Sequence, residues 1–366
     1  MRMIVTGGGT GGHIYPAVAI AKRVKIAIPD CDMLYIGSEY GLEEKIVKKE
    51  NLAYQSISVR GFDRKNIFKA IGAGFLLIKS LYQSYKVIRS FKPDLVIGTG
   101  GYVSGPVVFI AALLGVDTMI HEQNAVPGLT TSLLSRVANK VLVSYKDSMS
   151  YFKKQNKLHY TGNPVREAFS RADRDLSRKK LGIKDDELVI LSVGGSGGAT
   201  TINRLAKILA YEVEKMPNVR YFHITGKRFY DSFLESLELD KVSGRVKVMD
   251  YSDDIVTLMA ASDLAFSRSG AMSLAEMAAV SLPAILIPSP NVANNHQELN
   301  ARAFEKIGAC VMITEKDLTA EHFLSVINAL ISQPDKLKVM RGKFESLSRE
   351  NALNTIMSII YEYNLR

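Results

Sequence analysis

The sequence is poor in the residues that build disulfide or metal frameworks. It holds only two cysteines, Cys31 and Cys310, which lie far apart and belong to no C-x-x-C pair. This argues against a disulfide or zinc framework and fits a reducing cytosol. The six histidines show no H-x-x-x-H spacing, so neither metal chemistry nor a metal cofactor is expected.

Long apolar runs are missing as well. The longest one, from Val103 to Val116, is too short and too interrupted by proline to span a bilayer. A predicted strand begins at Met3, which leaves no room for a signal peptide before it. We therefore expect a soluble protein that binds at most to a membrane surface.

Acidic pairs are present but poorly placed for a metal. The two D-x-D triplets, Asp30/Asp32 and Asp173/Asp175, could indicate Mn²⁺-dependent sugar transfer. The first pair precedes a predicted strand and therefore lies at the wrong edge of a sheet, and the second lies in a densely charged stretch. Solvent-exposed charge is the better interpretation of both pairs.

An excess of acidic charge is lacking throughout. The net charge of +10 lies entirely in residues 1–163, and the remaining residues balance to zero. Residues 60–92 alone carry eight Lys or Arg side chains against a single acid, Asp63. Such a local positive field indicates an anionic partner for the first half of the chain.

The length of 366 residues favours two domains over one core. Short apolar runs alternate with helical patterns throughout, which is typical of α/β folds with parallel sheets. Strands are predicted at 3–6, 33–37, 54–57, 95–98, 118–121, 140–143, at "ELVILSV", and at 220–225, 246–249, 264–267, 284–287 and 310–313. The stretch that begins with "TGNPVR" interrupts this rhythm, so we expect two Rossmann-like domains, at 1–163 and 164–345.

Each predicted domain opens with a strand, a glycine turn and a helix. Ligands of open parallel sheets bind outside the carboxyl ends of the strands. We therefore expect the two sheets to face each other across a cleft and to offer their glycine turns to it.

The first turn, "TGGGTGGHIYP", combines glycines with a histidine. Gly7, Gly9 and Gly12 match the dinucleotide pattern G-x-G-x-x-G, although the acid that a nicotinamide site needs is only imperfectly supplied by Glu39. At a helix N-terminus, backbone N–H groups and the helix dipole favour a neutral imidazole. His13 is therefore a candidate general base that takes a proton from a hydroxyl.

The second half holds three motifs suited to a sugar nucleotide. "VGGSGGATTIN" places Ser196 in a turn for phosphate oxygens, and no lysine follows as in an ATPase loop. "SRSGAMSLAE" places Glu276 in an apolar helix, where a carboxylate can hold a ribose diol. "NVANNHQELN" gathers amides that match sugar hydroxyls, namely Asn294, Asn295, Gln297 and Asn300 beside His296. In the first half, Asn124 of "HEQNAVPG" suits the same task.

The basic stretch 67–92 also carries more apolar and aromatic side chains than one buried face needs. It resembles an interfacial anchor for anionic lipid. No helix-turn-helix, zinc or RNA-recognition signature is present, so a nucleic-acid partner is not expected. The residues predicted to contact the membrane are Lys69, Phe75, Leu76, Lys79, Tyr82, Lys86 and Arg89.

Together, "TGGGTGGHIYPAVAIA", "GTGGYVSGP", "HEQNAVPG", "TGNPVR", "GGSGGA" and "SRSGAMSLAE" resemble the glycosyltransferase family 28 enzymes of peptidoglycan synthesis. The resemblance implies a GT-B fold whose last helix, about 346–366, returns to the first domain. It implies an inverting enzyme, without metal or other cofactor, that moves N-acetylglucosamine (GlcNAc) from UDP-GlcNAc to the MurNAc hydroxyl of lipid I, giving lipid II. It also implies a peripheral place at the cytoplasmic face of the bacterial membrane, on an anionic surface, with other cell-wall synthesis proteins as candidate partners.

The resemblance also implies roles for individual residues. Ser196 and Arg166 would face the diphosphate, Glu276 would bind the ribose, and the backbone near Ser252 would read uracil. Gln297 and Asn300 would hold the sugar, and His13 would be the base. The nucleotide would be framed by the backbone of Ala271, Met272, Ser273, Leu274 and Ala275, and the first domain would contribute Thr10, Gly11, Gly12 and Asn124. Another GT-B transferase with a different acceptor, or a nicotinamide-binding protein, remains an alternative.

Overall fold

The computed structural model describes residues 1–61, 67–195, 197–348 and 352–364. The chain divides into two compact units, which are treated separately below. Unit 1 comprises residues 1–167 and 350–366, and unit 2 comprises residues 168–349.

Unit 1 is built on a seven-stranded sheet in the order β3-β2-β1-β4-β5-β6-β7, and all of its neighbouring strands are parallel. The strands are β1 (Arg2–Thr6), β2 (Asp32–Ser38), β3 (Ala53–Ile57), β4 (Leu95–Gly98), β5 (Asp117–Glu122), β6 (Lys140–Val143) and β7 (Leu158–Tyr160). The helices are α1 (Gly11–Ala27), α2 (Glu43–Lys49), α3 (Ile67–Phe91), α4 (Ser104–Leu113), α5 (Leu129–Leu134) and α15 (Ala352–Asn364).

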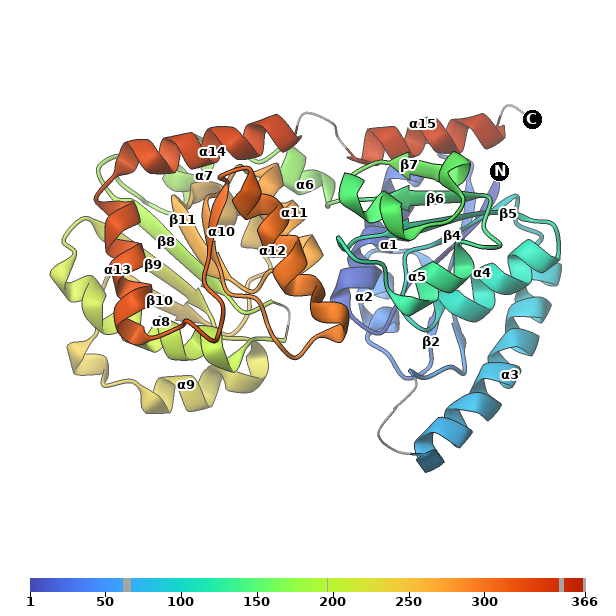
Figure 1. Ribbon diagram of the computed structural model, residues 1–366, viewed down its shortest axis with the longest axis horizontal. Helices are drawn as coiled ribbons and strands as arrows, with labels where there is room; N and C mark the ends of the chain where they lie inside the picture. Colours follow the sequence, from blue (N-terminus) through green and yellow to red (C-terminus); the bar gives the residue numbers. More distant parts are fainter. Residues whose placement is uncertain (62–66, 196, 349–351, 365–366) are drawn as a thin grey trace. The chain divides into compact units, whose positions relative to one another are not determined.

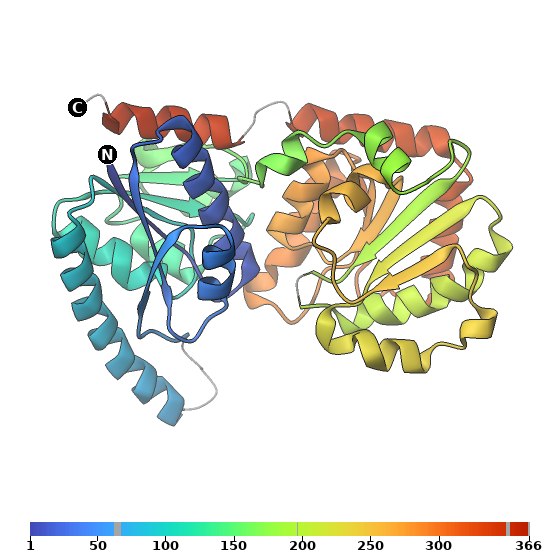
Figure 2. The ribbon, with the colours of Figure 1, turned by 180° about the vertical axis from the view of Figure 1, so that it is seen from behind.

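Both faces of this sheet are buried, as in other parallel sheets. Along β1, Met3 and Val5 point into the core cluster that contains α1 and α15, and Ile4 points into the cluster that contains α3 and α4. Figure 2 shows α1 in dark blue across the first face, with α15 in red beside it, and Figure 1 shows α4 and α5 on the other face. The C-terminal helix therefore completes unit 1, as predicted.

Unit 2 repeats the design with six parallel strands in the order β10-β9-β8-β11-β12-β13. The strands are β8 (Leu188–Val193), β9 (Val219–Ile224), β10 (Val246–Met249), β11 (Leu264–Ser267), β12 (Ala284–Leu286) and β13 (Cys310–Met312). The helices are α7 (Arg174–Lys180), α8 (Thr200–Glu212), α9 (Tyr230–Ser236), α10 (Ile255–Ala261), α11 (Ala271–Ala279), α12 (His296–Lys306), α13 (Ala320–Ile331) and α14 (Pro334–Ser348), and α6 (Glu167–Ser170) lies at the boundary of the units.

The predicted strands are confirmed to within one or two residues at each end. The structure adds β7, which the sequence analysis missed. This strand has only three residues, lies at the edge of the sheet and pairs with β6 alone, so it carries too little apolar pattern to be recognised.

Strand order reverses once in each sheet, between β1 and β4 in unit 1 and between β8 and β11 in unit 2. At such a reversal the loops that leave two neighbouring strands diverge and leave a crevice at the carboxyl edge of the sheet. The two glycine turns of the sequence follow β1 and β8 and therefore lie at these two points.

Candidate functional site

His13 lies at the strand-order reversal of unit 1, in the first turn of α1. The helix begins after Thr10, which has extended backbone angles and provides no side-chain cap. The side chain of His13 is half-buried, whereas Thr10 and Gly12 are exposed at the same edge. The first turn of the helix therefore presents backbone N–H groups and an imidazole together.

The loop that follows β4 packs directly against this turn. Gly8 N donates to Gly100 O over 3.3 Å. Gly101 has φ +77°, and a Cβ added there would lie 2.0 Å from Gly8 O. Gly100 has φ +100°, and its Cβ would lie 2.8 Å from His13 Nδ1. The glycines of "GTGGY" are thus needed because the backbone of this loop touches both the first glycine turn and the imidazole.

The imidazole of His13 is held at one nitrogen. Nδ1 lies 3.0 Å from the carbonyl oxygen of Thr99 and 3.0 Å from Oε1 of Gln123. A carbonyl oxygen can only accept, so Nδ1 carries the proton, an assignment that rests on the hydrogen-bond partners. No hydrogen bond from a described residue reaches Nε2 of His13. In this tautomer the lone pair of the ring lies on Nε2, as a general base requires, and the role of His13 as that base stays a prediction.

Asn124, predicted to bind substrate, is held by a carboxylate that the sequence analysis missed. Glu122 is buried, and its Oε1 accepts from N and Nδ2 of Asn124 over 3.0 and 3.1 Å. Its Oε2 accepts from Gly128 N over 3.0 Å. Glu122 therefore shapes the loop after β5 and orients the Asn124 amide. The motif "HEQN" contains this residue, but only the fold shows that it faces its own loop.

A second missed carboxylate, Glu43, lies beneath the first glycine turn. It is fully buried, and its Oε1 accepts from Gly9 N over 2.8 Å. A Cβ on Gly8 would lie 1.9 Å from the same oxygen. Among the described residues, Oε2 of Glu43 has no hydrogen-bond partner. Burial, and then this carboxylate, raise the pKa of Tyr35, whose hydroxyl donates to Gly7 O over 2.6 Å.

Arg166 lies in unit 1, with its guanidinium 5.9 Å from the centroid of the Tyr15 ring on α1. Its predicted partner at the diphosphate, Ser196, lies outside the described residues. The turn that contains Ser196 belongs to unit 2, so the two residues expected at the diphosphate come from different units.

The glycine turn of unit 2 packs against the loop after β9. Gly198 has φ +70°, and a Cβ there would lie 2.2 Å from Thr225 O. Asn203 of α8 donates through Nδ2 to the same carbonyl over 3.2 Å. These contacts place the N-terminus of α8 at the carboxyl edge of the sheet, where a helix N-terminus binds anions.

The predicted nucleotide residues follow β11, at the start of α11. The side chains of Ala271, Met272 and Leu274 are buried, so the predicted contact of this segment with a nucleotide would be made by its backbone. Ser273, Ala275 and Glu276 are half-buried on the same helix. Ser252 lies in the loop after β10, next to Tyr251, whose ring is 5.2 Å from Lys227 Nζ.

The loop predicted to hold the sugar is joined to this helix start through Ser269. Ser269 Oγ donates to Gln297 O over 2.8 Å, and Asn300 Nδ2 donates to Ser269 O over 3.3 Å. Asn300 is 0% exposed and anchors this helix start, and its contact with the sugar stays a prediction. Gln297 Oε1 accepts from Ser289 N over 2.9 Å, so its amide nitrogen remains as the donor for a ligand.

Residues around these predicted positions have mainly structural partners. His296 Nδ1 donates to Ala293 O over 2.8 Å at the start of α12. Asn294 and Asn295 adopt left-handed backbone angles, with φ 55° and 50°. Arg268, which was not predicted, donates to Ile287 O and Pro288 O over 3.1 and 3.2 Å and pairs with Glu315. Arg268 therefore fixes the beginning of the loop that is predicted to hold the sugar.

Comparison with known proteins decides the family. The N-terminal domain model of glycosyltransferase family 28 matches residues 3–143, and its C-terminal domain model matches residues 189–356. The chain is 44% identical over 363 residues to the UDP-N-acetylglucosamine–N-acetylmuramyl-(pentapeptide) pyrophosphoryl-undecaprenol N-acetylglucosamine transferase of Caldanaerobacter subterraneus, covering 98% of this chain and 99% of the relative. It is 42% identical over 362 residues to the transferase of the same name from Desulfitobacterium hafniense, covering 98% of both.

The crystal structure of Acinetobacter baumannii MurG superposes with a TM-score of 0.78 at 27% identity, covering 99% of each chain. The chain belongs to the MurG family. The two parallel sheets and the returning C-terminal helix are accordingly those of a GT-B fold. Membership also disfavours a nicotinamide site, and the acid proposed for one, Glu39, accepts from Ser58 Oγ over 2.8 Å.

The acidic pairs have structural partners. Asp173 caps α7 by accepting from Leu176 N over 2.8 Å, and Asp32 pairs with Arg2 over 3.5 Å. The part of the chain that the structure describes contains no group of three His, Cys, Asp or Glu residues that could hold a metal ion.

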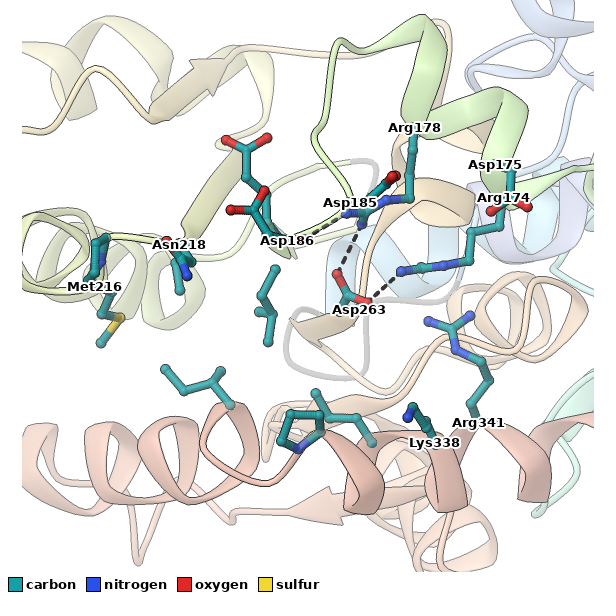
Figure 3. A pocket seen from close by; sticks show the side chains of 17 residues that line it. Arg174, Asp175, Arg178, Asp185, Asp186, Met216, Asn218, Asp263, Lys338 and Arg341 are labelled. Atoms are coloured by element: carbon teal, nitrogen blue, oxygen red, sulfur yellow. Dashed lines mark hydrogen bonds and ion pairs between the residues drawn. The ribbon is translucent and has the colours of Figure 1, made fainter.

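A cavity of about 880 Å³, which none of the predicted site residues lines, lies at the amino edge of the unit 2 sheet (Figure 3). Leu188 and Val219, the first residues of β8 and β9, line it. Asp263 pairs there with Arg174 and Arg178, which also donate to backbone carbonyls. These two arginines and Asp263 are therefore engaged in structural contacts.

The predicted membrane residues lie on α3, where residues 67–73, including Lys69, have no described side chains. Phe75 and Tyr82 are 73% and 59% exposed, and Leu76 is half-buried. Ile78, which was not predicted, is 68% exposed and shares the face of Phe75 and Tyr82. Lys79, Lys86 and Arg89 are exposed on the same helix. No described helix is long and apolar enough to cross a bilayer.

The packing of Gly100 against His13 gives a first prediction. In Gly100→Ala, the new Cβ meets His13 Nδ1 and the residue must hold a strained positive φ, so we expect a loss of about 2 to 4 kcal/mol in the free energy of unfolding. Urea unfolding measures this loss, and the His13 ring resonances should shift in the same variant.

The matched control is Gly115→Ala, because Gly115 also has a positive φ, +75°, but has no atom within 4 Å of its added Cβ. Gly115→Ala should lower the free energy of unfolding by only about 1 kcal/mol, which is the cost of the strained backbone angle without a steric contact. Equal losses in the two variants would show that the imidazole does not pack where the structure places it.

Proposed function

We infer that this chain transfers GlcNAc from UDP-GlcNAc to the MurNAc hydroxyl of lipid I, forming lipid II and UDP in peptidoglycan synthesis. The observation that carries the inference is the full-length similarity to transferases of that name, at 42% and 44% identity. The orientation of His13, with Nδ1 bound and Nε2 available, supplies the base that such a reaction needs.

The proposed step is a single displacement. The acceptor hydroxyl oxygen attacks the anomeric carbon of GlcNAc while its proton moves to Nε2 of His13. The new C–O bond forms as the bond from the anomeric carbon to the UDP oxygen breaks, with inversion, and the electron pair leaves on UDP. The departing charge is stabilised by backbone N–H groups at the start of α8, by Ser196 and by Arg166.

In this proposal, unit 2 binds the donor. Glu276 accepts from the ribose hydroxyls, the backbone of α11 from Ala271 to Ala275 frames the nucleotide, and the backbone near Ser252 reads uracil. The Gln297 amide nitrogen donates to the sugar, and the buried Asn300 holds the loop that carries Gln297. Unit 1 supplies the base and the acceptor site, and Thr10, Gly11, Gly12 and Asn124 close over both the donor and the acceptor.

We also propose that unit 1 binds the membrane peripherally, at the cytoplasmic face, through a surface formed by α3, α4 and α5. These helices pack side by side. Their exposed apolar side chains are Phe75, Ile78, Tyr82 and Tyr85 on α3, Phe109 and Leu113 on α4, and Leu129 and Leu133 on α5. Basic groups border the surface, and Lys86 Nζ lies 4.9 Å from the Tyr82 ring centroid. Apolar area together with adjacent cations is what peripheral binding to anionic lipid requires.

A transfer assay tests the reaction. Incubation with labelled UDP-GlcNAc and a lipid I analogue should give the lipid-linked disaccharide, with and without EDTA. In His13→Ala, kcat should fall by about 10² to 10⁴-fold because the base is lost. The dissociation constant for UDP-GlcNAc, measured by calorimetry, should stay within about twofold because most of the proposed donor contacts come from unit 2 and none of them is made by His13.

The control is His322→Ala, which removes an exposed histidine of unit 2 and should leave both quantities unchanged. Absence of disaccharide from the wild-type protein would refute the transfer, and loss of product with EDTA would refute its metal independence. Equal losses of turnover and donor affinity in His13→Ala would refute the role of His13 as base.

The membrane surface gives a separate prediction. Reversing the charges of Lys79, Lys86 and Arg89 to Glu should weaken binding to anionic vesicles by about 10-fold or more, from roughly 1 kcal/mol for each basic residue near the surface. Binding to neutral vesicles should hardly change. Sedimentation with vesicles of the two compositions measures both, and the same three-site reversal at Lys207, Lys215 and Lys241 of unit 2 is the control. Equal effects in both lipids, or of both triple variants, would contradict the proposed surface.

A further inference from the structure

We infer that Gln123 is a positioning residue for His13 and that it holds the imidazole in the tautomer with the proton on Nδ1. This inference deepens the proposed function and rests on it for its catalytic consequence. The placement of the proton is independent of the proposed function, because it follows from contacts within unit 1 alone.

The direction of each hydrogen bond in this network follows from the contact between His121 and the carbonyl oxygen of Gly162. His121 Nε2 lies 3.0 Å from Gly162 O, and a carbonyl can only accept, so this nitrogen carries a proton. His121 is fully buried, and burial lowers its pKa to about 4. The neutral ring then has an unprotonated Nδ1, which must accept a hydrogen bond.

That acceptor determines which way the Gln123 amide points. Gln123 Nε2 lies 2.9 Å from His121 Nδ1, 2.9 Å from Thr99 O and 3.1 Å from His121 O. All three atoms accept, so the NH₂ group belongs at this end of the amide. The opposite end, Oε1, is then the atom that faces His13 Nδ1 over 3.0 Å.

The reversed amide would conflict with every one of these contacts. Its oxygen would face two carbonyl oxygens and the lone pair of His121. Its NH₂ group would face His13 Nδ1, which would have to be unprotonated to accept a hydrogen bond. The lone pair of that nitrogen would then also face the carbonyl oxygen of Thr99, which can only accept. A buried polar group without a hydrogen-bond partner costs about 1 to 3 kcal/mol. Only one orientation of the Gln123 amide therefore satisfies all the groups of this network.

The side chain has little freedom to leave this position. Gln123 is 2% exposed, and its backbone carbonyl accepts from Asn163 Nδ2 over 3.0 Å. Asn163 in turn accepts from Ser144 Oγ over 2.7 Å. The amide thus reaches His13 from a rigid strand end, so its oxygen acts together with Thr99 O to fix the ring orientation and the proton position. The lone pair on Nε2 of His13 is the consequence.

The test combines ¹⁵N NMR of the full chain, labelled at its six histidines, with steady-state kinetics. Replacement of His13 by Gln assigns its signals. In the wild-type protein at neutral pH, Nδ1 of His13 should resonate as a protonated nitrogen and Nε2 as a bare one. In Gln123→Met, which keeps the volume but leaves Thr99 O as the one remaining acceptor of the two, the two signals should move toward each other as the other tautomer becomes more populated than in the wild type.

The kinetic counterpart is a fall in kcat of about tenfold to hundredfold in Gln123→Met, the range found when a group that orients a histidine is removed. KM for UDP-GlcNAc should change by less than about twofold. Gln155→Met is the matched control, because the Gln155 amide donates only to Met149 O and Phe152 O. A thermal unfolding midpoint of Gln123→Met close to that of the control variant guards against a misfolded methionine variant.

Wild-type His13 signals in Gln123→Met, or a kcat equal to that of Gln155→Met, would overturn the role of Gln123. A tautomer shift in a protein that transfers no sugar would instead refute the proposed function and leave the placement of the proton intact.

Discussion

The rest of this structure depends on the hydrogen bonds that two oxygens, Thr99 O and Gln123 Oε1, accept from Nδ1 of one imidazole. They come from the ends of neighbouring strands, β4 and β5, whereas His13 comes from the helix after β1. Only the reversal of strand order beside β1 brings the three segments together. The glycines at 100 and 101 then let the backbone approach without displacing the ring.

The two units apply the same topology to different tasks. In each, a glycine turn at the reversal exposes the N-terminus of a helix, which favours an anion. Unit 1 adds a histidine and two buried carboxylates, Glu43 and Glu122, that bind backbone N–H groups of the surrounding loops. Unit 2 adds amides and hydroxyls, linked through Ser269, that suit a sugar nucleotide. The proposed division of base and donor site between the units fits a transferase that must hold two substrates.

The sequence predicted the parts that local pattern encodes. Strand positions follow from apolar runs, and the turn with His13 follows from glycines next to an ionisable group. What it could not predict depends on contacts between distant residues. Gln123 was passed over because its partners lie at positions 13, 99 and 121. Glu43 was not singled out, because its burial beneath the glycine turn arises only from tertiary packing, and the burial of Asn300 was not predicted for the same reason. On α3, Ile78 is more exposed than Leu76 although both are apolar, because residues two positions apart lie on different faces of a helix.

The measurement that tests the central claim most directly is a neutron diffraction map of the deuterated wild-type protein at neutral pH, which locates the ring protons of His13 without any variant. The account predicts deuterium on Nδ1, directed toward Thr99 O and Gln123 Oε1, and none on Nε2. Deuterium on Nε2 with a bare Nδ1 would contradict it, because the nitrogen offered to the acceptor hydroxyl would then have no lone pair with which to take a proton.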